Sequence, residues 1–317
     1  MRAIMLHETG GPEVLKLTEV PEPAAGAGQV VIRTEAIGVS YTEASLRAGG
    51  YPMPVPLPAV YGVEAAGVVT ETGEGTDPAL AGRRVVVLST AMGCYAEYVA
   101  VPADVIAEIP SGISAADAVA VANFGAVALC ALRIANLTGE ETVLIEAAAG
   151  GAGGYLTQLA RRFGAKRVIG TAGGQAKAAY ARSIGADEVV DHTDPDWAAT
   201  LEPGSIDVAF ESIGGDTTAK LLPSLRPGSG RILAYGFLTG APTITALDLL
   251  SKGGTLTGCG GPLWFERVQA ARSDVFALVA DGHLTPRIDT MLPLEEAAEA
   301  HRRFDARAAI GKIVLTP

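Results

Sequence analysis

Between residues 120 and 260, short strand-like runs alternate with amphipathic stretches. The strand-like runs occupy residues 143–145, 167–171, 188–191, 206–210, 231–235 and 255–257. Residues 155–163 and 176–184 instead carry apolar side chains at helical spacing. Strands that alternate with helices predict an α/β fold with a doubly wound parallel sheet.

The rest of the chain follows a different pattern. Residues 1 to about 120 are rich in turns and predict a β-rich unit, with apolar runs at 30–34, 66–70, 84–88 and 95–101. The proline-rich stretch 52–58 can form neither a helix nor a central strand. The tail predicts helices at 264–280 and 294–305 and a closing strand at 313–316. A chain of 317 residues is long enough for two domains.

A glycine-rich loop separates the apolar run at 143–145 from the helix at 155–163. It contains Gly150, Gly151, Ala152 and Gly153. Glycines let the backbone approach a diphosphate closely, and a helix N-terminus offers free N–H groups and a positive dipole to the anion. A glycine loop between a buried strand and an amphipathic helix predicts a dinucleotide site rather than a plain tight turn.

The end of the next strand, about 20 residues beyond the loop, predicts which dinucleotide is bound. NAD-binding folds place an Asp or Glu there for the ribose 2′-hydroxyl. Residues 170–177 contain no acid here, and the next one is Asp187. A carboxylate would repel a 2′-phosphate, whereas the Thr171 hydroxyl, backbone amides and Lys177 would attract it. The missing acid favours NADPH over NADH, although Lys177 could equally be a solvated helix cation.

Charge and hydropathy argue against several classes of protein. The net charge of −11 argues against a general nucleic-acid or anionic-membrane binder, because either needs a basic surface. The N-terminal apolar run is too short for a signal peptide, and no run approaches the roughly 18 apolar residues that span a bilayer. We therefore expect a cytoplasmic protein.

The cysteines and histidines do not predict a metal site. Cys94, Cys130 and Cys259 lie far apart in the sequence, and the four histidines are scattered. A structural zinc needs four clustered ligands and a catalytic zinc at least three. We therefore expect no metal and three buried, reduced cysteines.

Several motifs resemble one family nearly end to end. They are residues 1–4 (MRAI), 10–15 (GGPEVL), 49–52 (GGYP), 62–69 (GVEAAGVV), 148–153 (AAGGAG), 183–187 (SIGAD) and 311–315 (GKIVL). The chain resembles the medium-chain dehydrogenase/reductase superfamily, and within it the zinc-independent NADPH quinone oxidoreductase and zeta-crystallin group. The resemblance implies a GroES-like catalytic domain from residues 1–120 and 262–317, and a Rossmann domain from residues 121–261.

The resemblance also bears on the chemistry. Zinc-dependent members carry a Cys where this chain has Ser40 and a His where it has Val63, so no Lewis acid would polarise a substrate oxygen. The acceptor of hydride must then be intrinsically electrophilic, such as a quinone or an activated enone. Ser40 and Tyr51 are the implied catalytic residues, although Tyr51 could instead be a core aromatic. The implied substrate pocket contains Tyr41, Ser45 and Leu238.

The cofactor contacts follow from the same resemblance. Gly150, Gly151, Ala152 and Gly153 would hold the pyrophosphate. The residues implied to surround the 2′-phosphate are Thr171, Gly173, Lys177, His192 and Arg307, and those implied on the nicotinamide side are Gly236 and Phe237. His192 could equally be an exposed turn residue and Arg307 a surface cation. A homodimer through the edge of the Rossmann sheet, around residues 243–258, is a further implication.

Departures from the group keep three functions open. The group usually carries Asn where this chain has Ser40, Thr where it has Val127 and often Tyr where it has Ser45. The first hypothesis is an NADPH-dependent reductase of a small-molecule quinone or enone. The second is a specialised biosynthetic enoyl reductase or cyclising enzyme, and the third is a non-enzymatic NADPH-binding protein.

Overall fold

The computed structural model describes residues 1–51, 56–89 and 91–317. The chain divides into two compact units, Met1–Asn123 with Arg272–Pro317 (unit 1) and Phe124–Ala271 (unit 2). The domain boundaries expected from the sequence, 120/121 and 261/262, stay a prediction. Residues 52–55 of the proline-rich stretch lie outside the described residues, so the expectation for them also stays a prediction.

Unit 2 contains a six-stranded parallel sheet in the order β11-β10-β9-β12-β13-β14. Its strands are β9 (Thr142–Ile145), β10 (Arg167–Ala172), β11 (Glu188–Asp191), β12 (Val208–Glu211), β13 (Arg231–Ala234) and β14 (Thr255–Gly258). The strand order reverses between β9 and β12, which is where doubly wound sheets bind their ligands. The predicted doubly wound α/β fold is confirmed.

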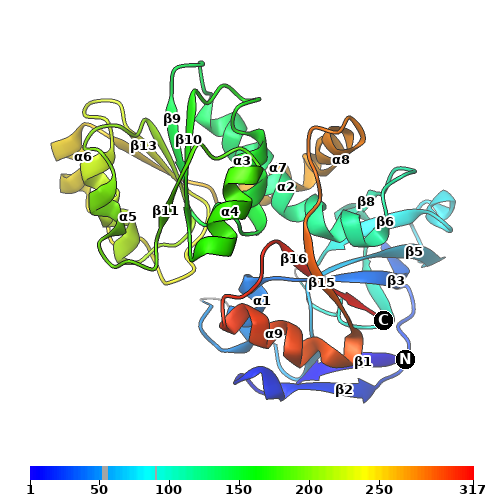
Figure 1. The fold of residues 1–317 in the computed structure, drawn as a ribbon. Coiled ribbons are helices and arrows are strands. Elements are labelled where there is room, and N and C mark those ends of the chain that lie inside the picture. The colour runs from blue at the N-terminus through cyan, green and yellow to red at the C-terminus, as the bar shows by residue number, and fades with distance from the viewer. Residues whose placement is uncertain (52–55, 90) are drawn as a thin grey trace. The chain divides into compact units, whose positions relative to one another are not determined.

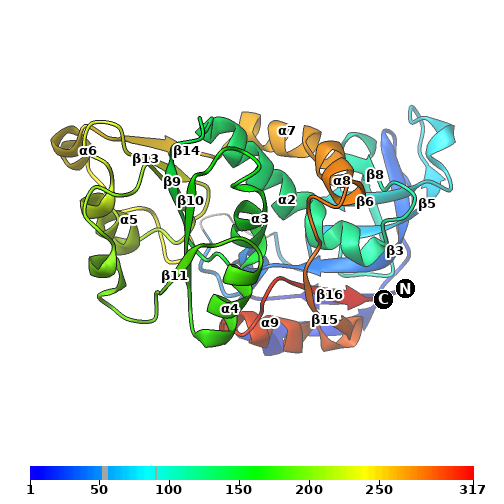
Figure 2. The same cartoon turned by 45° about the horizontal axis from the view of Figure 1, so that its top comes forward.

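Helices cover both faces of this sheet. In Figures 1 and 2, α3 (Gly151–Leu159) and α4 (Gln175–Ser183) lie on one face, and α5 (Asp216–Lys220) and α6 (Ala246–Lys252) on the other. Val143, Leu144 and Ile145 of β9 are fully buried. A central strand covered on both faces must be continuously apolar, and for this reason β9 could be predicted from the sequence.

The helix α2 (Ala115–Ala135) is absent from the sequence prediction. An 18-residue window of it has a mean hydropathy of 1.9, so by length and composition it could cross a membrane, and 72 % of that window is buried within the protein. The expectation that no such run exists is therefore wrong. Asp117 and Asn123, which are both partly exposed, interrupt the run in the sequence. Such burial is what the core helix of a folded domain shows.

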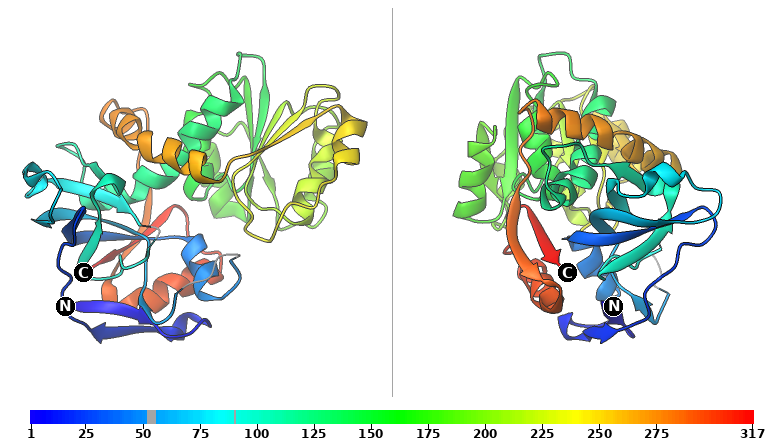
Figure 3. Two further views of the ribbon diagram at one scale, coloured as in Figure 1. Left: turned by 180° about the vertical axis from the view of Figure 1, so that it is seen from behind. Right: turned by 90° about the vertical axis from the view of Figure 1, so that its right-hand side faces the viewer.

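Unit 1 contains a seven-stranded sheet and a three-stranded sheet. The larger has the order β15-β16-β3-β5-β6-β8, with β7 also paired to β3, and the smaller has the order β2-β1-β4. Their strands are β1 (Arg2–Leu6), β2 (Leu15–Glu19), β3 (Gln29–Val39), β4 (Ala59–Val60), β5 (Glu64–Thr72), β6 (Arg84–Leu88), β7 (Tyr98–Pro102), β8 (Ile106–Glu108), β15 (Ile288–Pro293) and β16 (Lys312–Thr316). Only β15 and β16 pair in parallel among the described strands of the larger sheet (Figure 3).

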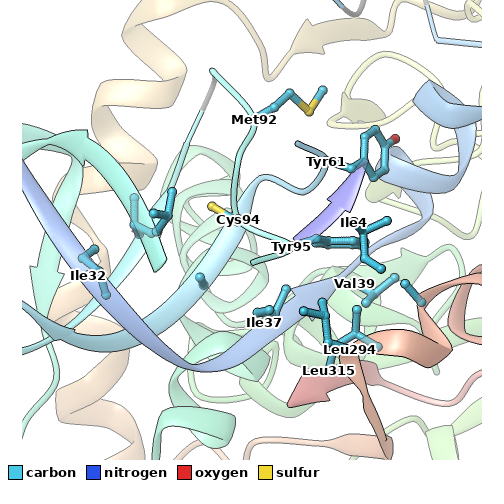
Figure 4. Close-up of a cluster of buried hydrophobic side chains, with 14 of the residues drawn as sticks. Ile4, Ile32, Ile37, Val39, Tyr61, Met92, Cys94, Tyr95, Leu294 and Leu315 are labelled. Atoms are coloured by element: carbon cyan, nitrogen blue, oxygen red, sulfur yellow. The ribbon is translucent and has the colours of Figure 1, made fainter. Parts of the chain in front are cut away.

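The core of unit 1 is apolar side chains from its strands and from α9 (Ala297–Asp305). Figure 4 shows Ile4, Tyr61, Tyr95, Leu294 and Leu315 in this cluster, and all five are fully or almost fully buried. The rings of Tyr61 and Tyr95 meet edge to face with centroids 5.5 Å apart. Because this core draws on both ends of the chain, the tail belongs to the same unit as the N-terminal strands.

The remaining helices are short. They are α1 (Tyr41–Arg47), α7 (Pro262–Ala270) and α8 (Arg272–Ala280), with 3-10 turns at Pro12–Val14, Pro78–Leu80, Ala103–Val105, Trp197–Thr200, Leu222–Ser224 and Leu294–Glu296. The single helix expected at 264–280 is thus two helices, and the break between them coincides with the boundary between the units.

Candidate functional site

The glycine loop joins β9 directly to α3. Ala147 adopts a left-handed backbone, with φ of 49°, and the chain then enters α3 at Gly151. A Cβ on Gly153 would lie 2.8 Å from the Glu146 carbonyl oxygen and closer still to that of Ala147. Gly153 therefore permits the close approach of helix to strand that the turn requires.

The first turn of α3 has the chemistry of an anion site. Gly150 is its N-cap and supplies no side-chain cap. The first N–H groups of a helix have no partner within the helix, and the positive end of its dipole lies among them. Gly150, Gly151, Ala152 and Gly153 are thus brought together in one turn that fits a pyrophosphate, and their role as cofactor ligands stays a prediction.

The second loop of the dinucleotide unit is organised by Thr171. This residue is buried, and its hydroxyl accepts a hydrogen bond from the Ala147 N–H at 3.2 Å. The same hydroxyl lies 3.2 Å from His192 Nδ1. If it donates to Nδ1, neutral His192 carries its proton on Nε2, where it can serve as a donor. Thr171 therefore positions His192 rather than facing solvent itself.

Gly173 completes this second loop. A Cβ there would lie 3.1 Å from His192 Nε2, so the absent side chain leaves space beside that nitrogen. Lys177 lies nearby in sequence, in the first turn of α4, and is partly exposed. The structure thus brings Thr171, Gly173 and His192 together. Arg307 is an exposed residue of unit 1 that follows α9, so its place relative to Lys177 stays a prediction.

Asp191 is an acid that the spacing argument missed. It ends β11, which pairs with β10, and its Oδ1 accepts hydrogen bonds from the Gly174 N–H at 3.3 Å and the Thr193 N–H at 3.0 Å. The Thr193 hydroxyl donates to the same oxygen at 2.7 Å. These hydrogen bonds, with that from the Thr193 backbone first, lower the pKa of Asp191. A carboxylate therefore lies at this loop, supplied by the neighbouring strand rather than by the loop sequence.

The loop after β13 carries the residues expected on the nicotinamide side. A Cβ on Gly236 would lie 2.7 Å from the Ser212 carbonyl oxygen, so the glycine lets this loop pack against the loop after β12. Phe237 and Leu238 follow and are more than a third exposed, which is unusual for large apolar side chains. Their roles as nicotinamide and substrate contacts stay predictions.

Two buried acids, Glu146 and Glu211, were missed at the same edge of the sheet. They directly follow β9 and end β12, two strands that pair in parallel, and both are fully buried. Burial, and then the charge of Glu211, raise the pKa of Glu146. Burial also raises the pKa of Glu211. The signal that could have found them is an acid at the carboxyl end of an apolar strand.

In unit 1, Glu43 lies between the two positions where zinc-dependent relatives would carry ligands. The N–H groups of Ser40 and Val63 donate to its two oxygens at 2.8 and 3.0 Å. The Ser40 hydroxyl accepts from the Glu43 N–H and caps α1. A serine used as a cap, a valine and an engaged carboxylate do not fit a zinc ion. Across the described residues, no three His, Cys, Asp or Glu side chains cluster as metal ligands.

The other predicted residues of unit 1 lie on or near α1. Tyr41 and Ser45 are one helical turn apart and partly exposed. The Gly50 N–H donates to the Ser45 carbonyl at 2.9 Å, which holds the segment leading to Tyr51 against α1. Tyr51 packs against the core cluster, and burial raises its pKa. Both its packing role and its proposed catalytic role are therefore compatible with the structure.

Comparison with known proteins identifies the class. Residues 26–111 match the alcohol dehydrogenase GroES-like domain family, and residues 184–315 match the zinc-binding dehydrogenase family. The chain is 34 % identical over 342 residues to a 2-haloacrylate reductase of Burkholderia sp., covering 99 % of this chain and 98 % of that protein. A GroES-like unit with a Rossmann unit defines the medium-chain dehydrogenase/reductase superfamily, and the chain belongs to it.

Two further similarities identify the group. The chain is 32 % identical over 326 residues to quinone oxidoreductase 1 of Escherichia coli K12, covering 99 % of each protein. The structure of Escherichia coli quinone oxidoreductase complexed with NADPH matches with a TM-score of 0.90 at 31 % identity, over 100 % of both chains. Within the superfamily, the chain belongs to the quinone oxidoreductase group.

Replacing Gly153 with Ala tests the close approach of α3. We expect Gly153→Ala to lower the free energy of unfolding by about 1–3 kcal/mol, because the new methyl overlaps two carbonyl oxygens that cannot both move. Urea unfolding measures this change. Gly154→Ala is the matched control, since its Cβ would meet nothing closer than 3.8 Å, and it should be neutral or slightly stabilising. Equal losses in both variants would contradict the packing argument.

Glu43 predicts a pH dependence of stability. Burial raises its pKa from 4.5 to about 7, so between these values the folded state holds a proton that the unfolded state has released. Its contribution to stability is fully present below pH 4.5 and falls by roughly 3 kcal/mol as pH rises through 7. Urea unfolding across this range should show that decline in the wild type, and the total decline should be smaller by about that amount in Glu43→Gln.

The Glu43→Gln variant should be less stable than the wild type at low pH. Its amide oxygen can accept only one of the two N–H groups, from Ser40 or from Val63, and its NH₂ group cannot accept the other. Exposed Glu22→Gln is the control and should keep the wild-type slope. An unchanged slope in Glu43→Gln would show that Glu43 does not hold this proton.

Proposed function

We propose that this protein is an NADPH-dependent, metal-free reductase that transfers hydride to a quinone or an activated enone. The observation that carries the proposal is the pairing of two features: a glycine loop that fits a pyrophosphate, and Glu43 in place of a metal between Ser40 and Val63. The NADPH bound by the Escherichia coli relative supports the choice of cofactor.

The cofactor is held mainly by backbone and by a few polar side chains. The α3 N-terminus binds the pyrophosphate through its N–H groups. His192, oriented by Thr171, and Lys177 and Arg307 bind the 2′-phosphate as donors. Asp191 lies beside this loop, and its Oδ1 already accepts hydrogen bonds from Gly174 and Thr193. The preference for NADPH over NADH therefore rests on the three donors to the 2′-phosphate.

NADPH, when bound, supplies a hydride to the acceptor. The protein orients the acceptor and excludes water, and it provides no Lewis acid. The acceptor must therefore accept hydride unaided, as a quinone ring or the β-carbon of an enone does. Ser40, Tyr41 and Tyr51 supply hydroxyl groups for the hydroquinone or enolate oxygen that forms, and Ser45, Phe237 and Leu238 shape the pocket. The relatives named quinone oxidoreductase and 2-haloacrylate reductase support this substrate class.

The first test is NADPH consumption with a panel of quinones, alkyl enones and enoyl thioesters, with NADH in parallel. Turnover of simple quinones or enones, faster with NADPH, is the expected result. Strict preference for one enoyl thioester would identify a specialised biosynthetic enzyme instead. Tight NADPH binding without turnover of any acceptor would identify a non-enzymatic NADPH-binding protein.

Lys177 tests the cofactor assignment. We expect Lys177→Met to raise the Kd for NADPH about tenfold or more and to leave that for NADH unchanged, because only NADPH carries the 2′-phosphate. Fluorescence titration measures both constants. Lys166→Met, which removes an exposed lysine paired with Glu140 in the same unit, should change neither. Equal weakening of both cofactors would remove Lys177 from the 2′-phosphate site.

We propose further that the protein is a cytoplasmic homodimer. The three cysteines are buried and unpaired with one another, and such cysteines are typical of proteins in a reducing compartment. β14 is an edge strand with all four residues exposed, and Leu247 and Leu250 of α6 are 70 % and 78 % exposed. An uncovered sheet edge beside large apolar side chains is typical of an interface between subunits.

Leu250→Glu tests the dimer, because a buried carboxylate at the interface would oppose association. Light scattering after size-exclusion chromatography should give a dimer for the wild type and a monomer for this variant. Leu17→Glu, on the exposed face of β2, is the control and should stay dimeric. A monomeric wild type would refute the proposal.

A further inference from the structure

The acids Glu146 and Glu211 form a pair that the proposed reaction does not use. β9 and β12 pair in parallel with Ile145 opposite Phe210, so the next residues along each strand, Glu146 and Glu211, are neighbours. The Glu146 N–H donates to the Phe210 carbonyl at 3.1 Å, which extends the pairing to this position. Both side chains are fully buried. Two like charges in one buried place repel each other strongly.

The hydrogen bonds around the pair leave one carboxyl oxygen of each acid able to share a proton. Glu146 Oε2 accepts from the N–H groups of Ser212 and Ile213 at 2.9 and 3.2 Å, and Glu211 Oε1 accepts from the Gly214 N–H. Glu146 Oε1 and Glu211 Oε2 have no partner within hydrogen-bond distance, and the buried Thr218 hydroxyl faces Glu211. Neither acid forms an ion pair with any described residue. A proton held between the two unpartnered oxygens would leave one negative charge, which the three N–H groups stabilise.

These same contacts join the loops that the proposed site uses. Glu146 directly precedes Ala147 of the glycine loop, and its carboxylate holds Ser212 and Ile213. The Ser212 and Ile213 carbonyls accept from the N–H groups of Leu238 and Thr239 at 3.2 and 2.7 Å. A continuous set of hydrogen bonds therefore runs from the pyrophosphate loop, through the acid pair, to the loop after β13.

We propose that Glu146 and Glu211 share one proton and act as positioning residues, which hold these two loops in the geometry that binds NADPH. The inference rests on the proposed function, since it concerns the affinity for that cofactor. Loss of the proton places two negative charges side by side. The loop after β12 must then move away, and the loop after β13 moves with it.

Other titratable groups near the pair do not change charge first. Tyr235 directly follows β13, and its N–H donates to the Glu211 carbonyl at 2.9 Å. Burial raises its pKa well above the ordinary value, and the nearby charges of Glu146 and Glu211 add to the shift. Cys259, which follows β14, has a pKa raised to about 11, mainly by burial. Of these three, the acid pair is therefore the one that loses a proton first as pH rises above neutral.

The test is the Kd for NADPH of the full-length protein between pH 6 and pH 9.5, measured by fluorescence. In the wild type we expect the Kd to rise about tenfold for each pH unit beyond a midpoint, because only the protonated pair is competent. Glu146→Gln places an NH₂ group where the proton lies, so its Kd should stay near the low-pH wild-type value throughout. Glu211→Gln should likewise lose the dependence.

Glu188→Gln is the matched control, since Glu188 forms a half-exposed ion pair with Arg167 in the same unit. It should keep the wild-type dependence. A second readout needs no cofactor: at neutral pH the infrared difference spectrum between the wild type and Glu146→Gln should contain the carbonyl band of a protonated buried carboxyl, because Glu43 contributes equally to both proteins.

The outcomes separate the two proposals. A wild-type pH dependence that persists in Glu146→Gln, or the absence of the infrared difference band, would overturn the shared proton. Failure to bind NADPH at any pH would overturn the proposed function, and the infrared difference band would still decide whether the proton is shared. Circular dichroism confirms that each variant is folded.

Discussion

The pairing of β9 with β12 is the contact on which the proposed cofactor site depends. From these two strands the chain winds in opposite directions across the sheet, so the loops that follow them diverge at a single edge. The glycine loop, the loop from Ser212 to Gly214 and the loop after β13 all begin at this edge. A slip of one residue in the pairing would turn Glu146 away from Glu211 and separate the loops that they join.

In unit 1, a carboxylate organises the place where zinc-dependent relatives carry metal ligands. Glu43 accepts the N–H groups of both Ser40 and Val63, so it ties the start of α1 to the segment before β5. Such a buried carboxylate is costly to ionise, and this cost is visible as the raised pKa. A carboxylate can order the backbone as a metal does, yet it cannot withdraw electrons from a substrate oxygen. In the proposed reaction, the acceptor must therefore supply the reactivity toward hydride.

Much of the fold was predictable because the local hydrophobic periodicity of the sequence indicates its helices and strands. The buried strands of the parallel sheet and the glycine loop are continuous features of the sequence, and the family motifs extend them to both units. The helix α2 was not predicted because Asp117 and Asn123 interrupt its apolar run in the sequence. The Ser40 to Glu43 capping box was readable from sequence, since a serine followed three residues later by a glutamate is a known helix start.

The residues that escaped prediction are those whose partners come from another strand. Asp191 reaches the loop at Gly174 only because β11 pairs with β10, and Glu146 meets Glu211 only because β12 pairs with β9. Spacing rules measure distance along the chain, so they cannot detect such neighbours. Two buried acids without a cation weaken a fold unless a proton or a ligand compensates them. Their presence at the switch point, where doubly wound sheets bind their ligands, therefore argues for a role in binding rather than in stability alone.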